Sequence, residues 1–234
     1  MTSFTKRSDQ KELIDDLNCD GDELRQTLRE LKTINKLLGG NHVTTNGINQ
    51  LLSRATSNKI AIADVGCGGG DMIRVMHHWS QKKRLNASFV GIDANPNTIA
   101  MAADNLRELR NVHFEASDVF DSAFQKQQVD IVTCTLFTHH FTDEELIRMF
   151  RSFKNKARIG MVINDLHRHP LAFFSIKILT RFFSKSRLVI NDAPISVQRG
   201  FKKKELEEIL HRAGWKNYRI SWHWAFRWQV LGIR

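Results

Sequence analysis

A glycine-rich stretch at residues 60–71 constrains the fold of this chain more than any other feature. It reads Ile-Ala-Ile-Ala-Asp-Val-Gly-Cys-Gly-Gly-Gly-Asp, and apolar residues at helical spacing follow it. An apolar run that ends in such a turn and leads into a helix is typical of a buried parallel strand in an α/β protein. Glycine has no Cβ, so the turn allows a ligand to lie directly against the backbone. The stretch therefore predicts a strand, a ligand-binding turn and a helix.

The spacing of the glycines separates two classes of ligand. A dinucleotide fingerprint, Gly-x-Gly-x-x-Gly, would place its third glycine at position 71, which is Asp. A carboxylate at that position would repel a pyrophosphate docking at the helix N-terminus. An NAD-dependent reductase is therefore disfavoured, and the remaining pattern is Asp64-x-Gly66-x-Gly68-x-Gly70.

Two later apolar runs also end in acidic residues. Residues 89–92 precede Asp93, which comes 27 positions after Gly66, and residues 112–117 precede Asp118. The carboxyl ends of parallel strands lie at one edge of a sheet, where open α/β folds bind their ligands. We therefore expect Asp93 to face the glycine turn and to accept hydrogen bonds from ribose hydroxyls.

Together these residues resemble the cofactor-binding half of class I S-adenosylmethionine (SAM) methyltransferases, over residues 58–166. SAM carries an ammonium and a sulfonium group, which acidic residues beside the glycines would suit. The resemblance implies SAM as the cofactor, with Asp118 accepting from the adenine amino group. The residues that it implies for cofactor binding are Asp64, Gly66, Cys67, Gly68, Gly70, Asp71, Asp93, Ala94, Asp118, Val119 and Thr135.

The same resemblance implies a fold and a domain organisation. The fold is an α/β, Rossmann-like, doubly wound and mostly parallel sheet of seven strands, with an antiparallel C-terminal strand pair. Residues 1–57 are predicted to form a helical cap, and residues 58–234 the methyltransferase domain with a helical insertion at 167–198. Within the cap, Gly39-Gly40 is expected to end a first helix, and a second helix is expected over residues 45–56. Residues 191–196 are expected to form a loop.

Composition narrows the class of protein further. The three cysteines show no paired spacing and indicate reduced thiols in a cytoplasmic protein. No run of about 20 uncharged residues is available for a membrane-spanning helix. The net charge is +10. Nucleic-acid base methyltransferases of this fold carry a Pro-Pro motif after strand four, and this chain has none, so no nucleic-acid partner is expected. The oligomeric state stays open.

Residues 133–140, at the end of the fourth expected strand, lie where this fold places the acceptor. They read Thr-Cys-Thr-Leu-Phe-Thr-His-His and resemble the corresponding stretch of ubiquinone-biosynthesis O-methyltransferases. Those enzymes have metal-linked glutamates where this chain has Leu136 and Thr138, so no metal ion is expected. His140 is the residue of this stretch that has a matching residue in those enzymes.

Three other stretches, residues 12–16, 35–40 and 196–201, resemble a bacterial subgroup of uncharacterised or polyketide-associated methyltransferases. The resemblance implies O-methylation of a small aromatic, polyketide or quinone-like acceptor. Two alternatives remain open. One is a C-methyltransferase of a quinone or lipid acceptor, and the other is a non-catalytic SAM-binding protein that acts through interactions.

Methylation of a phenol requires a base, and histidine suits this role because its usual pKa lies close to operating pH. His140 is the first candidate and His139 the second, both at the mouth of strand four. Asp165 is a third candidate. It belongs to a second polar group at the mouth of strand five, with Asn164, His167 and Arg168.

The stretch at residues 170–187 is strongly apolar, and its basic residues Lys177, Arg181 and Lys185 recur every four positions. On a helix they would form one stripe. Two roles are predicted for this helix and both stay open. It could be a lid over a hydrophobic acceptor, or it could lie on the anionic inner face of a membrane as a peripheral contact.

Overall fold

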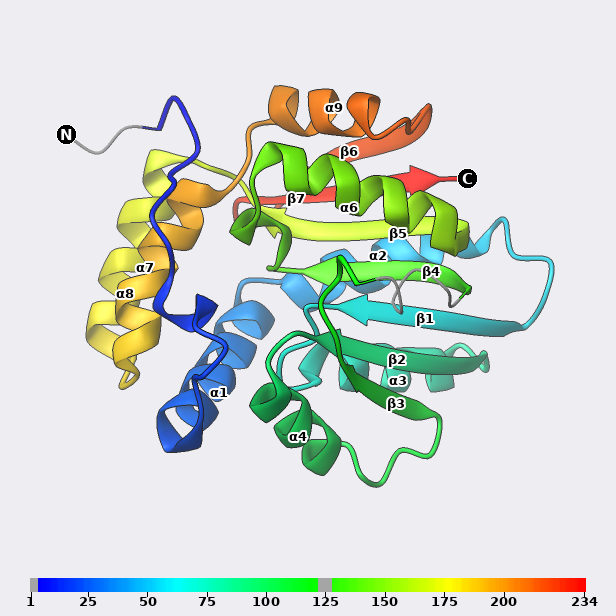
Figure 1. Cartoon of the computed structure of the whole chain (residues 1–234), viewed down its shortest axis with the longest axis horizontal. Coiled ribbons are helices and arrows are strands. Elements are labelled where there is room, and N and C mark those ends of the chain that lie inside the picture. Colours follow the sequence, from blue (N-terminus) through cyan, green and yellow to red (C-terminus); the bar gives the residue numbers. More distant parts are fainter. Residues whose placement is uncertain (1–3, 122–127) are drawn as a thin grey trace.

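A twisted sheet of seven strands crosses the protein in the order β3-β2-β1-β4-β5-β7-β6. The computed structural model describes residues 4–121 and 128–234 (Figure 1). The strands are β1 (Lys59–Val65), β2 (Asn86–Asp93), β3 (Val112–Ala116), β4 (Val129–Thr135), β5 (Ala157–Leu166), β6 (Asn217–His223) and β7 (Arg227–Ile233). Strands β1 to β5 pair in parallel, while β7 runs antiparallel to both β5 and β6. The fold predicted from the sequence is confirmed.

Helices cover both faces of this sheet. They are α1 (Gly21–Leu37), α2 (Gly40–Leu52), α3 (Asp71–Lys82), α4 (Pro96–Asn105), α6 (Asp143–Lys156), α7 (Pro170–Phe183), α8 (Arg187–Arg199) and α9 (Lys203–Arg212), with short 3₁₀ turns η1 (Leu13–Asp15) and η2 (Thr138–His140). Successive strand residues point to opposite faces. Along β1, Ile60 and Ile62 pack with α2 and α3, whereas Ala63 and Val65 pack with α6 and α9. Both faces of the central strands are therefore buried, as their continuous apolar sequences require.

The N-terminal helices differ from the prediction at their boundary. Gly39 adopts a left-handed conformation with φ of 75°, and it precedes the first residue of α2 directly. Only Leu38 and Gly39 therefore separate the two helices, and α2 begins at Gly40 rather than at residue 45. Asn41 and His42, which fall between the two expected helices, are in the first turn of α2. Helix α2 packs against β5 and β7.

The predicted loop at residues 191–196 is also wrong, because these residues lie within α8. A proline inside a helix costs about 3 kcal/mol, and Pro194 favoured a break. The buried side chains of Leu188, Val189 and Ile195 attach this helix to the protein, and such packing outweighs local propensity. Helix α7 ends at Phe183, so Lys185 lies in the linker between α7 and α8.

An extended N-terminal segment, residues 4–20, crosses the front of α8 before it enters α1 (Figure 1). We call it the strap. Asp192 of α8 accepts hydrogen bonds from the backbone N–H groups of Leu13 and Ile14, at 2.9 and 3.0 Å. At the other end, Asn95 Nδ2 donates to the carbonyl of Cys19. The strap therefore joins α8 to the loop before α4, above the carboxyl edge of the sheet.

In the part of the chain that the structure describes, no helix has both the length and the apolar character needed to cross a lipid bilayer.

Candidate active site

A cavity of about 1390 Å³ opens at the carboxyl edge of the sheet, under the strap. A pocket for one drug-sized ligand usually has a volume of about 300–1,000 Å³. The cavity therefore has room for a nucleoside cofactor together with a small acceptor. Its walls come from the glycine loop (residues 66–70), the strap, α1, η2, α7 and α8.

The glycine loop forms one wall because its backbone adopts conformations that other residues avoid. Gly66 and Gly68 have φ of 70° and 51°. A Cβ on Gly66 would lie 2.2 Å from the ring of Phe137, so no larger residue fits there. Gly70, expected to contact the cofactor, is not part of the cavity wall. It caps the start of α3 with φ of 78° and packs against Leu106.

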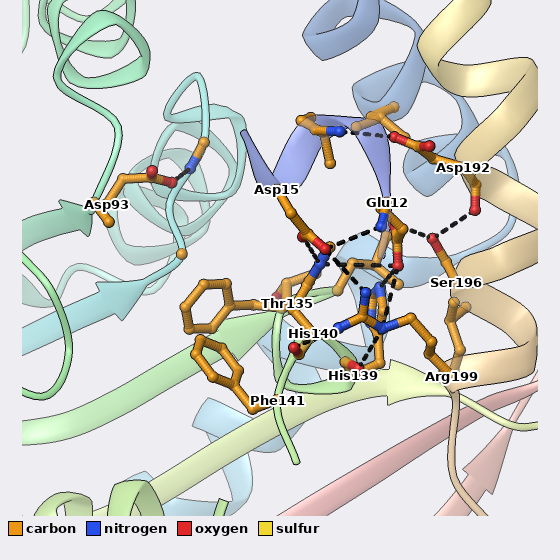
Figure 2. Close-up of a pocket in the computed structure, with 18 of the residues that line it drawn as sticks. Glu12, Asp15, Asp93, Thr135, His139, His140, Phe141, Asp192, Ser196 and Arg199 are labelled. Atoms are coloured by element: carbon orange, nitrogen blue, oxygen red, sulfur yellow. Dashed lines mark hydrogen bonds and ion pairs between the residues drawn. The ribbon is translucent and has the colours of Figure 1, made fainter. Parts of the chain in front are cut away.

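Asp93 lies at the end of β2 and faces the glycine loop, as predicted. Its Oδ2 accepts from the backbone N–H of Gly68 at 3.1 Å (Figure 2). Its Oδ1 accepts from that of Asn95 at 3.1 Å. Each carboxylate oxygen has a second lone pair, so Asp93 can still accept from two ligand hydroxyls. Burial raises the pKa of this carboxyl group.

Acidic groups gather on the same side of the cavity. Asp64 is buried at the end of β1 and accepts from the hydroxyl of Thr133 at 2.7 Å. Burial, together with the charges of Asp71 and Asp93, raises its pKa to about 7. Burial also raises the pKa of Asp71. Acids in this state are stabilised by a nearby cation, so the residues present fit the ammonium group of SAM.

The remaining predicted cofactor residues lie around this wall. Cys67, Ala94, Asp118, Val119 and Thr135 all line the cavity. Asp118 is exposed, and its Oδ1 accepts from the backbone N–H of Phe120. The Thr135 hydroxyl bonds to that of Thr44 at 2.9 Å, which attaches β4 to α2. A direct contact of any of these residues with the cofactor stays a prediction.

His139 and His140 point toward the strap from η2 (Figure 2). His139 is only 2% exposed. Its Nδ1 lies 2.7 Å from Asp165 Oδ1, and an ionised carboxylate can only accept, so the imidazole donates. The charge of His139 and its hydrogen bond hold the pKa of Asp165 well below its usual range, although burial alone would raise it.

His140 is the more accessible of the two rings. Its Nδ1 donates to Asp15 Oδ1 at 2.6 Å. Burial would raise the pKa of Asp15, but the hydrogen bond from His140 and the charges of His140 and Arg199 outweigh it and hold the pKa well below its usual range. An ionised Asp15 fixes the orientation of the ring, so Nε2 is the nitrogen left to accept a proton.

Glu12 lies deepest in the strap, and the sequence interpretation did not select it. Its Oε2 accepts from the hydroxyl of Ser196 at 2.6 Å. Its Oε1 is buried with no hydrogen-bond partner among the described residues and lies 3.5 Å from His139 Nε2. Burial raises the pKa of Glu12 to about 7, while the charges of His140 and Arg199 partly oppose this rise.

Arg199, at the end of α8, holds the strap and η2 together. It donates to Asp15 Oδ2 at 2.9 Å and to the carbonyl of Gln10 at 3.1 Å. It also donates to the carbonyls of His139 and His140. One guanidinium group thus fixes the Asp15 carboxylate relative to the backbone of His140.

Glu12, His139 and His140 bring one carboxylate oxygen and two imidazole nitrogens within 4.8 Å of one another, an arrangement that could hold a metal ion. Arg199 Nε lies 3.8 Å from Glu12 Oε1, and its positive charge opposes a cation there. The expected absence of a metal stays a prediction.

The second polar group does not reach the cavity. Asp165 accepts from Thr138 Oγ1 at 2.6 Å and from the backbone N–H of His139 at 3.1 Å, so it supports η2 from below. Asn164 donates to the carbonyl of Gly40, and Arg168 is buried against Glu205. Burial, with the charges of His169 and Lys202, lowers the pKa of His167 to about 4. These four residues are absent from the cavity wall.

Comparisons with known proteins agree with this geometry. Residues 62–160 match the family model described as a methyltransferase domain. Two curated mRNA cap guanine-N(7) methyltransferases from strains of Cryptococcus neoformans var. neoformans serotype D are each 28% identical over 111 residues, which is 46% of this chain. The aligned part spans only 17% and 15% of those two proteins.

Three solved structures show the same fold at low identity. The plantazolicin methyltransferase with bound S-adenosylhomocysteine (SAH) has a TM-score of 0.66 and 16% identity, covering 92% of each chain. Human N-acetylserotonin methyltransferase with SAM has a TM-score of 0.65 and 13% identity, covering 97% of this chain and 60% of its own. Magnesium protoporphyrin IX methyltransferase from Synechocystis PCC 6803 with SAH has a TM-score of 0.55 and 16% identity, covering 84% and 83%.

Residues 62–160 thus match a methyltransferase-domain model, and the fold and the glycine loop agree with that match. The match begins within β1 and ends within β5, so it includes the strand ends that carry Asp93 and precede His140.

Proposed function

We propose that this protein binds SAM along the glycine loop and transfers its methyl group to the hydroxyl of a small, hydrophobic acceptor. The observation that carries the proposal is the Asp15–His140 pair, which places an oriented imidazole on the cavity wall just past β4. SAM, when bound, supplies an electrophilic methyl group on a sulfonium. Asp93 and the backbone of Gly68 support its binding, and Asp64 and Asp71 balance its positive charge.

In this proposal, His140 is the base. Its Nε2 would accept the hydroxyl proton of the acceptor, and SAM, held by the glycine loop and Asp93, would supply the methyl group to the oxygen. The charge that forms on the ring is stabilised by Asp15, which already accepts from Nδ1. His139 is too buried to meet the acceptor and instead holds η2 through Asp165.

The part of the cavity beside the strap, α7 and α8, which we call the acceptor half, favours an apolar molecule. Its walls include Leu31 of α1, Ile176 of α7, and Leu188 and Val197 of α8. Such surfaces bind aromatic or quinone-like rings through burial of apolar area. This agrees with the hydroxylated aromatic, polyketide or quinone-like acceptor implied by the sequence.

Turnover of SAM to SAH with a panel of acceptors tests the proposal. We expect product with hydrophobic phenols and hydroquinones, and mass spectrometry with NMR of the product should locate the methyl group on oxygen. Methylation on carbon would replace the O-methyl assignment. Binding of SAM without turnover on any acceptor would favour a non-catalytic binding protein. Capped RNA belongs in the panel because the curated relatives are named for that substrate, and exclusive turnover of it would overturn the proposal.

A further inference from the structure

Helix α7 presents an apolar face to solvent, which is unusual for a helix on the outside of a protein. Its buried arc consists of Ala172, Phe173 and Thr180, which pack toward the protein. The opposite arc carries Leu171, Phe174, Ile178 and Phe182, with exposures of 63%, 53%, 60% and 74%. These four recur at spacings of three and four and therefore share one side of the helix. Helices that are apolar on all sides are normally covered.

Figure 1 shows α7 beside α8 at the periphery of the molecule, separated from the sheet. Phe183, at the end of α7, is 80% exposed. At the other end, His169 stacks on Phe226 at 5.0 Å, and Phe226 contacts the exposed side chains of Trp222 and Trp224. Exposed aromatic side chains at the end of β6 and in the turn to β7 thus lie near the start of α7.

The charges around α7 indicate what kind of surface covers its exposed apolar face. Residues 166–191 contain no Asp or Glu, but they include Lys177, Arg181, Lys185 and Arg187. Lys177 and Arg181 flank the apolar arc on one side of α7, and neither has an ion pair to a carboxylate in residues 4–121 and 128–234. Arg187 lies further on and pairs with Glu23. An apolar helix face with a cationic flank matches an anionic lipid surface in both respects.

We propose that the outer face of α7 docks on the surface of an anionic lipid bilayer. At 14 residues, α7 is shorter than the ~20 residues that a spanning helix needs, so it lies in the interface with Leu171, Phe174, Ile178 and Phe182 among the acyl chains. Lys177 and Arg181 contact the lipid phosphates. A second copy of this chain is the less suitable occupant, because two chains of net charge +10 repel each other.

The docking surface lies directly behind the acceptor half of the cavity. Ile176, on the buried side of α7, lines that cavity, and so do Leu188 and Val189 of α8. A lipid-soluble molecule in the bilayer would therefore be separated from the cavity by the thickness of one helix. The membrane contact itself does not depend on the proposed reaction, so the two can fail separately.

Co-sedimentation of the full chain with vesicles tests the docking. We expect binding to mixed phosphatidylcholine and phosphatidylglycerol vesicles, weaker binding at high salt, and little binding to phosphatidylcholine alone. The paired change Ile178→Asn and Phe182→Asn should lower partitioning about tenfold, and Lys177→Glu with Arg181→Glu should lower it at least as much. All four side chains are exposed, so thermal unfolding of both variants should match that of the wild type.

The control variant carries Lys204→Glu and Lys216→Glu, which make the same charge change at exposed positions outside α7. We expect its partitioning to stay within about twofold of the wild type, because interfacial binding depends on charges beside the buried apolar face. Equal losses in the control and the α7 variants would overturn the proposal in favour of unspecific attraction. Failure of the wild type to bind anionic vesicles at low salt would also overturn it, as would a concentration-dependent dimer that the Ile178→Asn and Phe182→Asn changes abolish.

Discussion

The two halves of the cavity are built in different ways. The cofactor half comes from short segments of β1, β2 and the glycine loop, and its acids lie at strand ends within residues 64–93. The acceptor half joins the strap at Glu12 and Asp15 to η2 and to Arg199, so its parts come from three distant regions of the chain. A cofactor that is the same in all enzymes of a class can be held by one local motif. An acceptor that differs between them requires parts that vary independently.

The most severe test of this division is the removal of the proposed base. His140→Ala should lower kcat by about 10²–10⁴-fold, because general-base catalysis contributes that range, while the dissociation constant for SAM stays within about twofold. Steady-state kinetics and calorimetric titration measure the two quantities. Asp15→Asn is the matched variant. It keeps the shape of the pair and should give a smaller loss with a changed pH profile. Full activity of His140→Ala would show that η2 does not supply the base. It would also contradict the division of the cavity into these two halves.

A change in the cofactor half should have the opposite pattern. Asp93→Ala should weaken SAM binding by about ten- to a hundredfold, since hydrogen bonds to a charged group contribute ~1.5–3 kcal/mol. Titration calorimetry measures this, and circular dichroism checks that the fold survives. Asp104→Ala, on the exposed surface of α4, is the control. If both variants bind SAM equally well, Asp93 does not hold the ribose of the cofactor.

The pH dependence of the free energy of unfolding tests whether Glu12 is buried in the acceptor half as the structure shows. Burial raises the pKa of Glu12 from 4.5 to about 7, so the folded protein binds this proton more tightly than the unfolded chain does. The resulting stabilisation is fully present below pH 4.5 and is lost as pH rises to about 7. Glu12→Gln removes this dependence. Between pH 4.5 and 8, the stability of the variant relative to the wild type should therefore increase by about 1–3 kcal/mol.

Denaturant unfolding at several pH values gives this difference. Glu208→Gln, exposed on α9, should show almost none of it. A constant difference between Glu12→Gln and the wild type across the whole range would mean that Glu12 ionises in the folded protein as it does in the unfolded chain.

The smallest expected effect concerns the attachment of the strap. Asp192→Ala removes the acceptor of two backbone hydrogen bonds, at Leu13 and Ile14. Trypsin cleavage within the strap, at Lys11, should become about fivefold faster, equivalent to ~1 kcal/mol of local opening. Thermal unfolding and SAM affinity should change little. Cleavage at the wild-type rate would show that Asp192 does not hold the strap closed.

The sequence predicted the sheet and the cofactor half because their signals are local. An apolar run, a glycine turn and an acid at a strand end fix both the strand and the position of Asp93. The boundary of α2 and the continuity of α8 were missed for the same reason. Gly40 and Pro194 are read locally as interruptions, but α2 begins at Gly40, and long-range packing of Leu188 and Ile195 keeps α8 continuous.

The acceptor half could be predicted only in part. His139 and His140 were found because they follow a strand directly. Glu12, Asp15 and Arg199 were not, since nothing in the spacing of residues 12 and 199 shows that they meet. One signal was available. The stretches at residues 12–16 and 196–201 that resemble the same bacterial subgroup are the ones that converge on His140.

The strap has a consequence for the timing of turnover. Asp15, which orients His140, belongs to the segment that covers the cavity, and Arg199 fastens both to α8. In the proposed reaction, any opening of the strap to admit an acceptor would take from His140 the carboxylate that aligns it. Its return would cover the cavity and orient the imidazole in one movement. Exchange of molecules and proton abstraction would then occupy separate moments of the proposed cycle.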